Sequence, residues 1–158
     1  MIVSTRGHGA PLNELSKLLA IEAIKTLKAR YFRCIDTKDW PGLEALFATD
    51  CVLDIRQDVA DGVFAGAANI AAMVRTSLAE VTTVHHGHCP EIAITSETTA
   101  TGVWAMEDLL RFPAHSAAPL KSLQGFGHYH ETYECIGGQW CFKTITLTRL
   151  RVDMRSRN

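Results

Sequence analysis

The second half of the chain is a succession of long β-type segments, and this feature restricts the fold more than any other. Two turn-forming pairs interrupt the succession, Ser96-Glu97 and Gly137-Gly138, and the second pair is a strong hairpin signal. A loop is expected at 113–119. Because strands joined by short turns pair antiparallel, we expect a meander of long strands. The predicted strands cover residues 84–95, 98–112, about 122–136 and 139–152.

The first half of the chain is mainly helical. Apolar residues recur at three- and four-residue intervals from Leu12 to Ile35, which is the pattern of a long amphipathic helix. A second, short helix is expected to begin at Asp39-Trp40-Pro41, since proline is well tolerated in a first helical turn. Its apolar face is expected to comprise Leu43, Leu46 and Phe47. Short strands at 51–55 and 62–66 and a third helix at 67–79 complete this half.

Helices followed by strands indicate an α+β fold with the helices packed on one face of the sheet. A curved, mixed or antiparallel sheet wrapped around the long N-terminal helix would leave an apolar pocket between them. With 158 residues the chain is long enough to bury one core. We expect a single domain at 11–153, a flexible N-terminus at 1–10 and a C-terminal tail at 154–158.

Composition excludes several classes of protein. Hydrophobic residues at 47% and charged residues at 21% are typical of a soluble globular domain. A formal net charge of -1 gives no broad attraction for nucleic acid or an anionic membrane, and the apolar runs are too short to cross a bilayer. The five cysteines show no C-x-x-C spacing, and the N-terminus lacks the apolar run of a signal peptide. We therefore expect a cytoplasmic protein without a disulfide framework.

Three separated blocks of sequence carry a family resemblance. They are IEAIKTLKARYFRCIDTKDW, then HHGHCPEIAITSETTATGVWAMED, then GHYHETYE with GGQWCFKTITLTRLRV. From Ile21 to Val152 the chain resembles SnoaL-like proteins of the nuclear-transport-factor-2-like (NTF2-like) fold. Within that group it looks most like the bacterial bile acid 7α-dehydratases and, more distantly, scytalone dehydratase. The resemblance implies a cone with an open-faced curved sheet, a cavity closed by helices, and a homo-oligomer, with a trimer favoured over a dimer.

The resemblance also implies a catalytic set. It consists of Tyr31 and Asp36 near the end of the first helix, His85 at the start of a long strand, and Arg149 on the last strand. Histidine titrates near neutrality and can act in turn as base and acid. A carboxylate such as Asp36 would hold its tautomer, and the Tyr31 hydroxyl would donate a hydrogen bond to a developing enolate.

Three members of this set also have a structural interpretation. Tyr31 lies on the apolar stripe of the helix and fits a core aromatic residue, while Asp36 lies where a terminal aspartate often caps a turn. Five residues separate the two, so both can face a cavity only if the helix ends or bends there. Arg149 can either stabilise an anionic part of a substrate or pair with Asp108 or Glu107.

Further residues are candidates for the pocket wall. Along a strand His85 points to one side and His86 and His88 to the other, so His85 is expected to enter the cavity alone. His128 is the candidate for a second histidine in the site, and it shares a strand face with His130. The apolar candidates, any of which can instead be plain core, are Phe64, Trp104, Met106, Phe126 and Leu147.

No cofactor or metal is expected from the sequence. The glycine-containing segments GVFAG and GFG do not occupy the strand-to-helix turn of a dinucleotide or phosphate site. The histidines at 85, 86, 88, 128 and 130 have no diagnostic metal-binding spacing, and no acidic third ligand is evident among them.

These features support three functional hypotheses. The first is a cofactor-independent dehydratase acting on a hydrophobic, polycyclic hydroxy-ketone such as a steroid or polyketide-like compound. The second retains the same groups but shuttles a proton, as in a ketosteroid isomerase, or eliminates a halide. The third is a non-catalytic ligand-binding protein or an assembly subunit, comparable to the β subunits of ring-hydroxylating dioxygenases.

Overall fold

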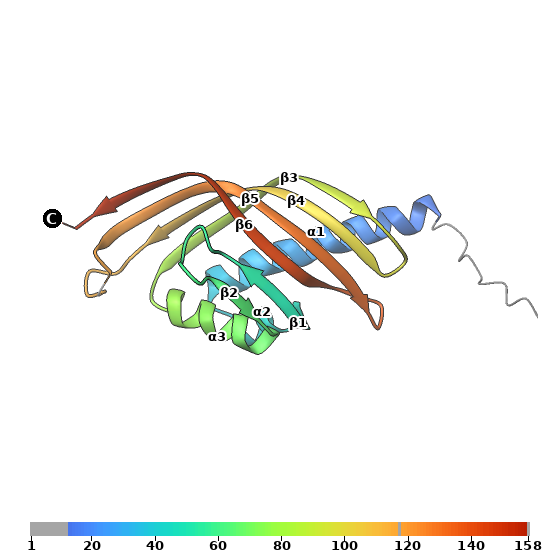
Figure 1. Cartoon of the computed structure of the whole chain (residues 1–158), viewed down its shortest axis with the longest axis horizontal. Helices are drawn as coiled ribbons and strands as arrows, with labels where there is room; N and C mark the ends of the chain where they lie inside the picture. Colours follow the sequence, from blue (N-terminus) through green and yellow to red (C-terminus); the bar gives the residue numbers. More distant parts are fainter. Residues whose placement is uncertain (1–12, 117, 158) are drawn as a thin grey trace, which may run out of the picture.

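A computed structural model describes residues 13–116 and 118–157 and shows an α+β fold (Figure 1). The predicted N-terminal segment, 1–10, lies outside the described residues. The order of helices and strands agrees with the order predicted from the sequence. The elements are α1 (Glu14–Thr37), α2 (Trp40–Glu44), β1 (Phe47–Asp54), β2 (Val63–Ala65), α3 (Ala67–Leu78), β3 (Thr82–Ile94), β4 (Thr99–Arg111), β5 (Leu120–Ile136) and β6 (Gln139–Ser156).

The strands form one mixed sheet in the order β2-β1-β6-β5-β4-β3. The four long strands pair antiparallel as a meander, and β1 joins its edge by pairing parallel to β6. Figure 1 shows that this sheet is long and strongly curved, with α1, α2 and α3 all on its concave side. Within the described residues no helix is both long and apolar enough to span a bilayer.

Helix α1 has well-defined ends. The Asn13 side chain accepts a hydrogen bond from the backbone N–H of Ser16 at 2.8 Å, as an N-cap residue does. At the other end Lys38 adopts a left-handed conformation, with φ of 64°, which terminates the helix two residues after Asp36. The buried residues of the helix begin at Ile24, whereas its first turns project past the sheet (Figure 1). Only part of the predicted apolar stripe is therefore buried, and the exposed leucines are Leu15, Leu18 and Leu19.

Several element boundaries differ from the prediction, and the largest differences are at the start of β1 and the end of β6. Helix α2 ends at Glu44, so Leu46 follows the helix and Phe47 begins β1 instead of extending an apolar helix face. Strand β6 continues to Ser156 by pairing with the first residues of β5. Residues 154–156, which we assigned to a C-terminal tail, are therefore part of the sheet.

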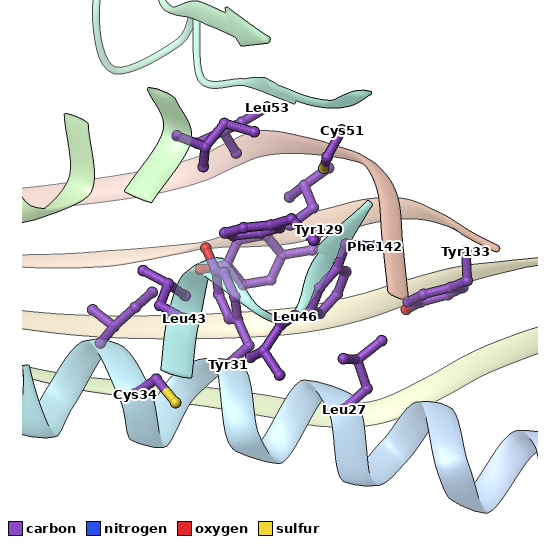
Figure 2. Close-up of a cluster of buried hydrophobic side chains, with 14 of the residues drawn as sticks. Leu27, Tyr31, Cys34, Leu43, Leu46, Cys51, Leu53, Tyr129, Tyr133 and Phe142 are labelled. Atoms are coloured by element: carbon purple, nitrogen blue, oxygen red, sulfur yellow. The ribbon is translucent and has the colours of Figure 1, made fainter. Parts of the chain in front are cut away.

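The core lies between α1 and the concave face of the sheet. Figure 2 shows Tyr31 of α1 beside Tyr129 of β5, with Phe142 and Leu46 close to them. Tyr31 makes edge-on contacts with Phe142 and Tyr129, at centroid distances of 5.3 and 6.3 Å. Helix α3 covers β1 and closes the same side of the sheet (Figure 1). This packing leaves a cavity between α1, α3 and the strands.

Candidate active site

The cavity has a volume of about 330 Å³, which is within the range of small-molecule sites. Most of its wall is apolar, as the fold prediction required. Residues from α1, β1, α3, β4, β5 and β6 contribute, including Ile35, Leu53, Val74, Leu110, Leu123 and Leu147. Leu147 was predicted as a wall residue, and the structure places it there. The polar part of the wall includes His85, Tyr31, Tyr129, Gln57, Asp58, Asp108 and Arg149.

His85 lines the cavity, and Asp36 binds it from the side that faces away from the cavity. Its Nδ1 lies 2.7 Å from Asp36 Oδ1, and its backbone N–H donates to Asp36 Oδ2 at 3.0 Å. The Thr83 hydroxyl donates to Asp36 Oδ1 at 2.8 Å, so the carboxylate is fixed by three hydrogen bonds. With Nδ1 bound to the carboxylate, Nε2 is left without a hydrogen-bond partner among the described residues. An imidazole arranged in this way presents one ring nitrogen for proton transfer.

This arrangement explains how Tyr31 and Asp36 can act together although five residues separate them along the helix. Tyr31 and His85 line the cavity, whereas Asp36 is not part of its wall. Asp36 lies in the last turn of α1 and contacts the beginning of β3 instead. Both residues can therefore belong to one site although they point to different sides of the helix.

The pKa of Asp36 lies below its ordinary value. Burial acts to raise this pKa, but the hydrogen bonds from the His85 side chain and backbone and from Thr83 outweigh burial. A carboxylate whose pKa is lowered on folding stabilises the protein above the pKa of the unfolded chain. That contribution disappears as the pH falls through the folded-state pKa.

We therefore expect Asp36→Asn to flatten the acid dependence of stability. The unfolding free energy of the unmodified protein should decrease as the pH falls from about 5, and that of Asp36→Asn should decrease less. Urea unfolding at a series of pH values measures both. Parallel pH profiles for the two proteins would contradict the lowered pKa.

Two tyrosines face the cavity. Burial, followed by the negative charge of Glu131, raises the pKa of Tyr31, so its hydroxyl stays protonated. Burial also raises the pKa of Tyr129 well above its ordinary value. Among the described residues neither hydroxyl forms a hydrogen bond, so both can donate to a molecule in the cavity. Sequence reasoning selected Tyr31 and missed Tyr129.

An aromatic ring supports the candidate base. Phe32 of α1 stacks on the His85 imidazole with an interplanar angle of 7° and a centroid distance of 6.3 Å. A Cβ atom at Gly87 would approach the Phe32 ring to 2.8 Å. The absence of a side chain at Gly87 therefore allows Phe32 to lie over the strand and restrict the orientation of His85.

Arg149 is enclosed by two carboxylates. It donates to Asp58 through Nε and Nη2 at 2.8 and 2.7 Å, and to Asp108 through Nη1 and Nη2 at 3.0 and 2.8 Å. A weaker contact to Met106 Sδ at 3.6 Å occupies the last N–H group. Burial lowers the pKa of Arg149, but these hydrogen bonds outweigh it and the net shift is upward. Arg149 therefore pairs with Asp108, as the second interpretation from the sequence states. No N–H group of its guanidinium remains free to bind a substrate anion.

The ion pairs of Arg149 with Asp58 and Asp108, here called the Arg149 cluster, connect three parts of the cavity wall. Asp58 belongs to the segment between β1 and β2, Asp108 to β4 and Arg149 to β6. Gly125 of β5 lies opposite Asp108 in the sheet, and a Cβ atom there would overlap the side chains of both Asp108 and Arg149. A glycine at this position lets the arginine reach across β5.

Two predicted pocket residues lie on the other face of the sheet. Phe126 is paired with Glu107 and His128 with Ala105, whereas the intervening Gly127 is paired with inward-facing Met106. Side chains directly opposite each other across strands share a face. Neither Phe126 nor His128 contacts the cavity, so the prediction that they line it is wrong.

Three other predicted wall residues are on the concave side but outside the cavity. Trp104 is buried and donates through Nε1 to the Tyr133 hydroxyl at 2.9 Å. Met106 is buried in the core beside Arg149, and Phe64 of β2 packs against the core from the edge of the sheet. All three residues therefore follow the alternative interpretation from the sequence, in which they are part of the hydrophobic core.

A buried polar cluster lies next to the cavity and was not predicted. Lys28 Nζ and Glu131 Oε1 are 2.5 Å apart, and both side chains are fully buried. Glu131 also accepts a hydrogen bond from the Tyr133 hydroxyl. The Lys28 ammonium lies 3.5 Å from the centroid of the Tyr129 ring. Burial lowers the pKa of Lys28 to about 8, although the charge and hydrogen bond of Glu131 act in the opposite direction.

Several solved structures share this fold. A protein from Novosphingobium aromaticivorans assigned as a scytalone dehydratase has 21% sequence identity and a TM-score of 0.78, over 90% of this chain and 92% of that chain. A type 2 hexachlorocyclohexane dehydrochlorinase, LinA, has 17% identity and the same TM-score of 0.78, over 91% of this chain and 94% of that chain. A variant of Rv3472, a protein of unknown function from Mycobacterium tuberculosis, has 26% identity and a TM-score of 0.70, over 85% of this chain and 78% of that chain.

A family model provides the sequence-level assignment. The model of the SnoaL-like domain matches residues 16–146, which span α1 to the middle of β6. This range contains His85, Asp36 and Tyr31 and ends three residues before Arg149. The chain therefore belongs to the SnoaL-like family.

Proposed function

We propose that this SnoaL-like protein is a cofactor-independent hydro-lyase. Its substrate would be a hydrophobic, polycyclic hydroxy-ketone such as a steroid or polyketide-like compound. The observation that carries the proposal is the 2.7 Å contact of His85 Nδ1 with Asp36, at the wall of an apolar cavity that also contains Tyr31. Solved proteins with the same fold include one assigned as a dehydratase and one named as a dehydrochlorinase, and both names describe eliminations.

The reaction begins with removal of a proton from the carbon beside the ketone. His85 Nε2 takes this proton, and the electron pair of the broken C–H bond moves to the carbonyl oxygen, which becomes an enolate. The Tyr31 hydroxyl donates a hydrogen bond to that oxygen. Because the pKa of Tyr31 is raised, the hydroxyl remains a donor throughout.

The second step expels the leaving group. The enolate electrons form the new carbon–carbon double bond and the C–O bond of the substrate hydroxyl breaks. His85, now an imidazolium stabilised by Asp36, returns its proton to the departing oxygen, which leaves as water. The protein ends the cycle in its initial protonation state, so no external cofactor or oxidant is needed.

The cavity wall supports an apolar substrate with few polar anchors. Apolar side chains form most of the wall, and Arg149 is already paired with Asp58 and Asp108. A free anionic group on the substrate would therefore find no unpaired cation at this cluster. Tyr129 supplies a second hydroxyl for a carbonyl or hydroxyl group of the substrate.

Mass spectrometry after incubation with a panel of hydroxy-enone steroids and hydroxynaphthalenones tests the proposal. We expect loss of one water from at least one compound, no turnover by His85→Ala, and undiminished turnover by His128→Ala. His128 is a matched control because it lies on the far face of the sheet. Unchanged turnover by His85→Ala would refute the mechanism.

The same assay separates the alternative reactions. An isomerisation leaves the mass of the compound unchanged, and elimination of hydrogen halide from a halogenated panel member removes a halogen. Both would require the His85 and Asp36 pair but not a hydroxyl leaving group. Turnover confined to halogenated compounds would replace the hydro-lyase assignment with a dehydrohalogenase.

A further inference from the structure

The face of the sheet opposite the cavity carries two histidines and a glutamate close together. One ligand atom from each of His86, His88 and Glu107 lies within 4.8 Å of the other two. The two imidazole rings are 5.9 Å apart between centroids. Both histidines are exposed and Glu107 is half-buried, so all three are on the accessible side of the sheet. Metal binding was set aside from the sequence because no acidic third ligand was evident, and the pairing of β3 with β4 supplies one.

The register of the two strands explains why these groups converge. His86 lies directly opposite Glu107, and His88 lies directly opposite Ala105. The four positions form the corners of a rectangle on one face, with Cβ atoms about 4.5–5.5 Å apart across the strands. Because Ala105 carries only a methyl group, the fourth corner is open above the sheet.

The ligand set and its surroundings fit a transition metal. Two imidazole nitrogens and one carboxylate are a donor set that suits divalent ions such as Zn²⁺, Ni²⁺ and Cu²⁺. Gln124 Nε2 donates to Glu107 Oε1 at 2.8 Å, which orients the carboxylate and leaves Oε2 available. Such hydrogen bonds to a ligating carboxylate are typical of metal sites.

We propose that His86, His88 and Glu107 bind one divalent transition-metal ion per chain. The open corner above Ala105 leaves a coordination position for water or an exogenous ligand. Strand β3 is at the edge of the sheet, so the bound ion would cross-link this edge strand to β4. The site is separate from the cavity, because His85 points to the opposite face of the same strand.

A second histidine pair on the same face provides a matched control. The rings of His128 and His130 are 6.2 Å apart, a spacing close to that of the first pair. No carboxylate completes a cluster with them among the described residues, and His130 Nε2 lies 3.1 Å from the Thr148 hydroxyl. This pair tests whether any two neighbouring histidines would bind the ion.

Calorimetric titration of the full-length, tag-free protein with Zn²⁺, after treatment with a chelator, tests the proposal. We expect saturable binding of one ion per chain and a rise in Tm with Zn²⁺, since an ion that binds only the folded state stabilises it. His88→Gln and Glu107→Gln should each weaken binding by about tenfold or more. His130→Gln should bind as the unmodified protein does. Electron paramagnetic resonance with Cu²⁺ should show nitrogen splitting from two imidazoles, reduced to one in His88→Gln.

Several results would overturn this proposal. One is the absence of saturable Zn²⁺ binding to the unmodified protein, and another is undiminished binding by His88→Gln or Glu107→Gln. An equal loss of binding in His130→Gln would show general attraction to surface histidines. One ion for every two chains would show a site shared between copies. Circular dichroism of each variant verifies that the sheet is intact.

Discussion

Asp36→Asn is expected to lower kcat by about 10²–10⁴-fold while KM changes little. In the native arrangement the carboxylate accepts a hydrogen bond from His85 Nδ1–H, which leaves the Nε2 lone pair free for the substrate proton. An asparagine amide can instead donate to Nδ1, which moves the ring proton to Nε2 and removes the base. The carboxylate also stabilises the imidazolium that forms, so the substitution removes two contributions at once. Steady-state kinetics on the compound identified by mass spectrometry measure the effect.

Asp39→Asn is the matched control for this substitution. Asp39 lies three residues further along the chain and caps α2 by accepting a hydrogen bond from the Gly42 N–H at 3.0 Å. Asparagine is nearly as good an N-cap residue as aspartate, so activity and stability should both be retained. Full activity in Asp36→Asn, or equal losses in the two variants, would contradict the role assigned to Asp36.

Lys28→Met is expected to reduce the free energy of unfolding by about 3–5 kcal/mol. The substitution leaves the Glu131 carboxylate fully buried without its cation. An unpaired buried charge lowers the free energy of unfolding much more than removal of both charges of the pair does. Lys28→Met/Glu131→Gln removes both charges and should recover most of the lost stability, because the amide can still accept the Tyr133 hydroxyl hydrogen bond. Urea unfolding of both variants measures these values.

An exposed ion pair on the same helix is the control for this prediction. Lys25 and Glu22 are 2.6 Å apart but both side chains are solvent-exposed. Lys25→Met should therefore change the unfolding free energy by less than about 1 kcal/mol. Similar effects of Lys28→Met and Lys25→Met, or no recovery in the double variant, would contradict the importance of burial.

The order of elements could be predicted from the sequence because each depends on local signals. Apolar residues at helical spacing mark α1, and Gly137-Gly138 marks the turn between β5 and β6. Alternation along β3 was enough to direct His85 to one side of the sheet and its neighbours to the other. These predictions do not depend on which strands pair or on the register of the pairing.

The errors concern register and long-range partners. The inward side of β5 is set by its pairing with β4 and by a bulge against β6 near Phe126, neither of which has a local signal. A shift of one residue exchanges the faces of a strand. Phe126 and His128, which we expected in the pocket, lie on the opposite face, and Tyr129, which we did not name, lies on the inward face. Lys28 and Glu131, 103 residues apart, come together only in the folded chain. Their burial reverses the usual expectation for charged residues.

Nitrogen-15 NMR of the histidine side chains tests the central claim, that Asp36 prepares His85 as a base in the cavity. We predict that His85 at mildly alkaline pH carries its proton on Nδ1 and that Nε2 is unprotonated. In Asp36→Asn the signal should shift towards the Nε2–H tautomer, while the signals of His128 and His130 remain unchanged. A ring protonated on Nε2 in the unmodified protein, or no change in Asp36→Asn, would contradict the account.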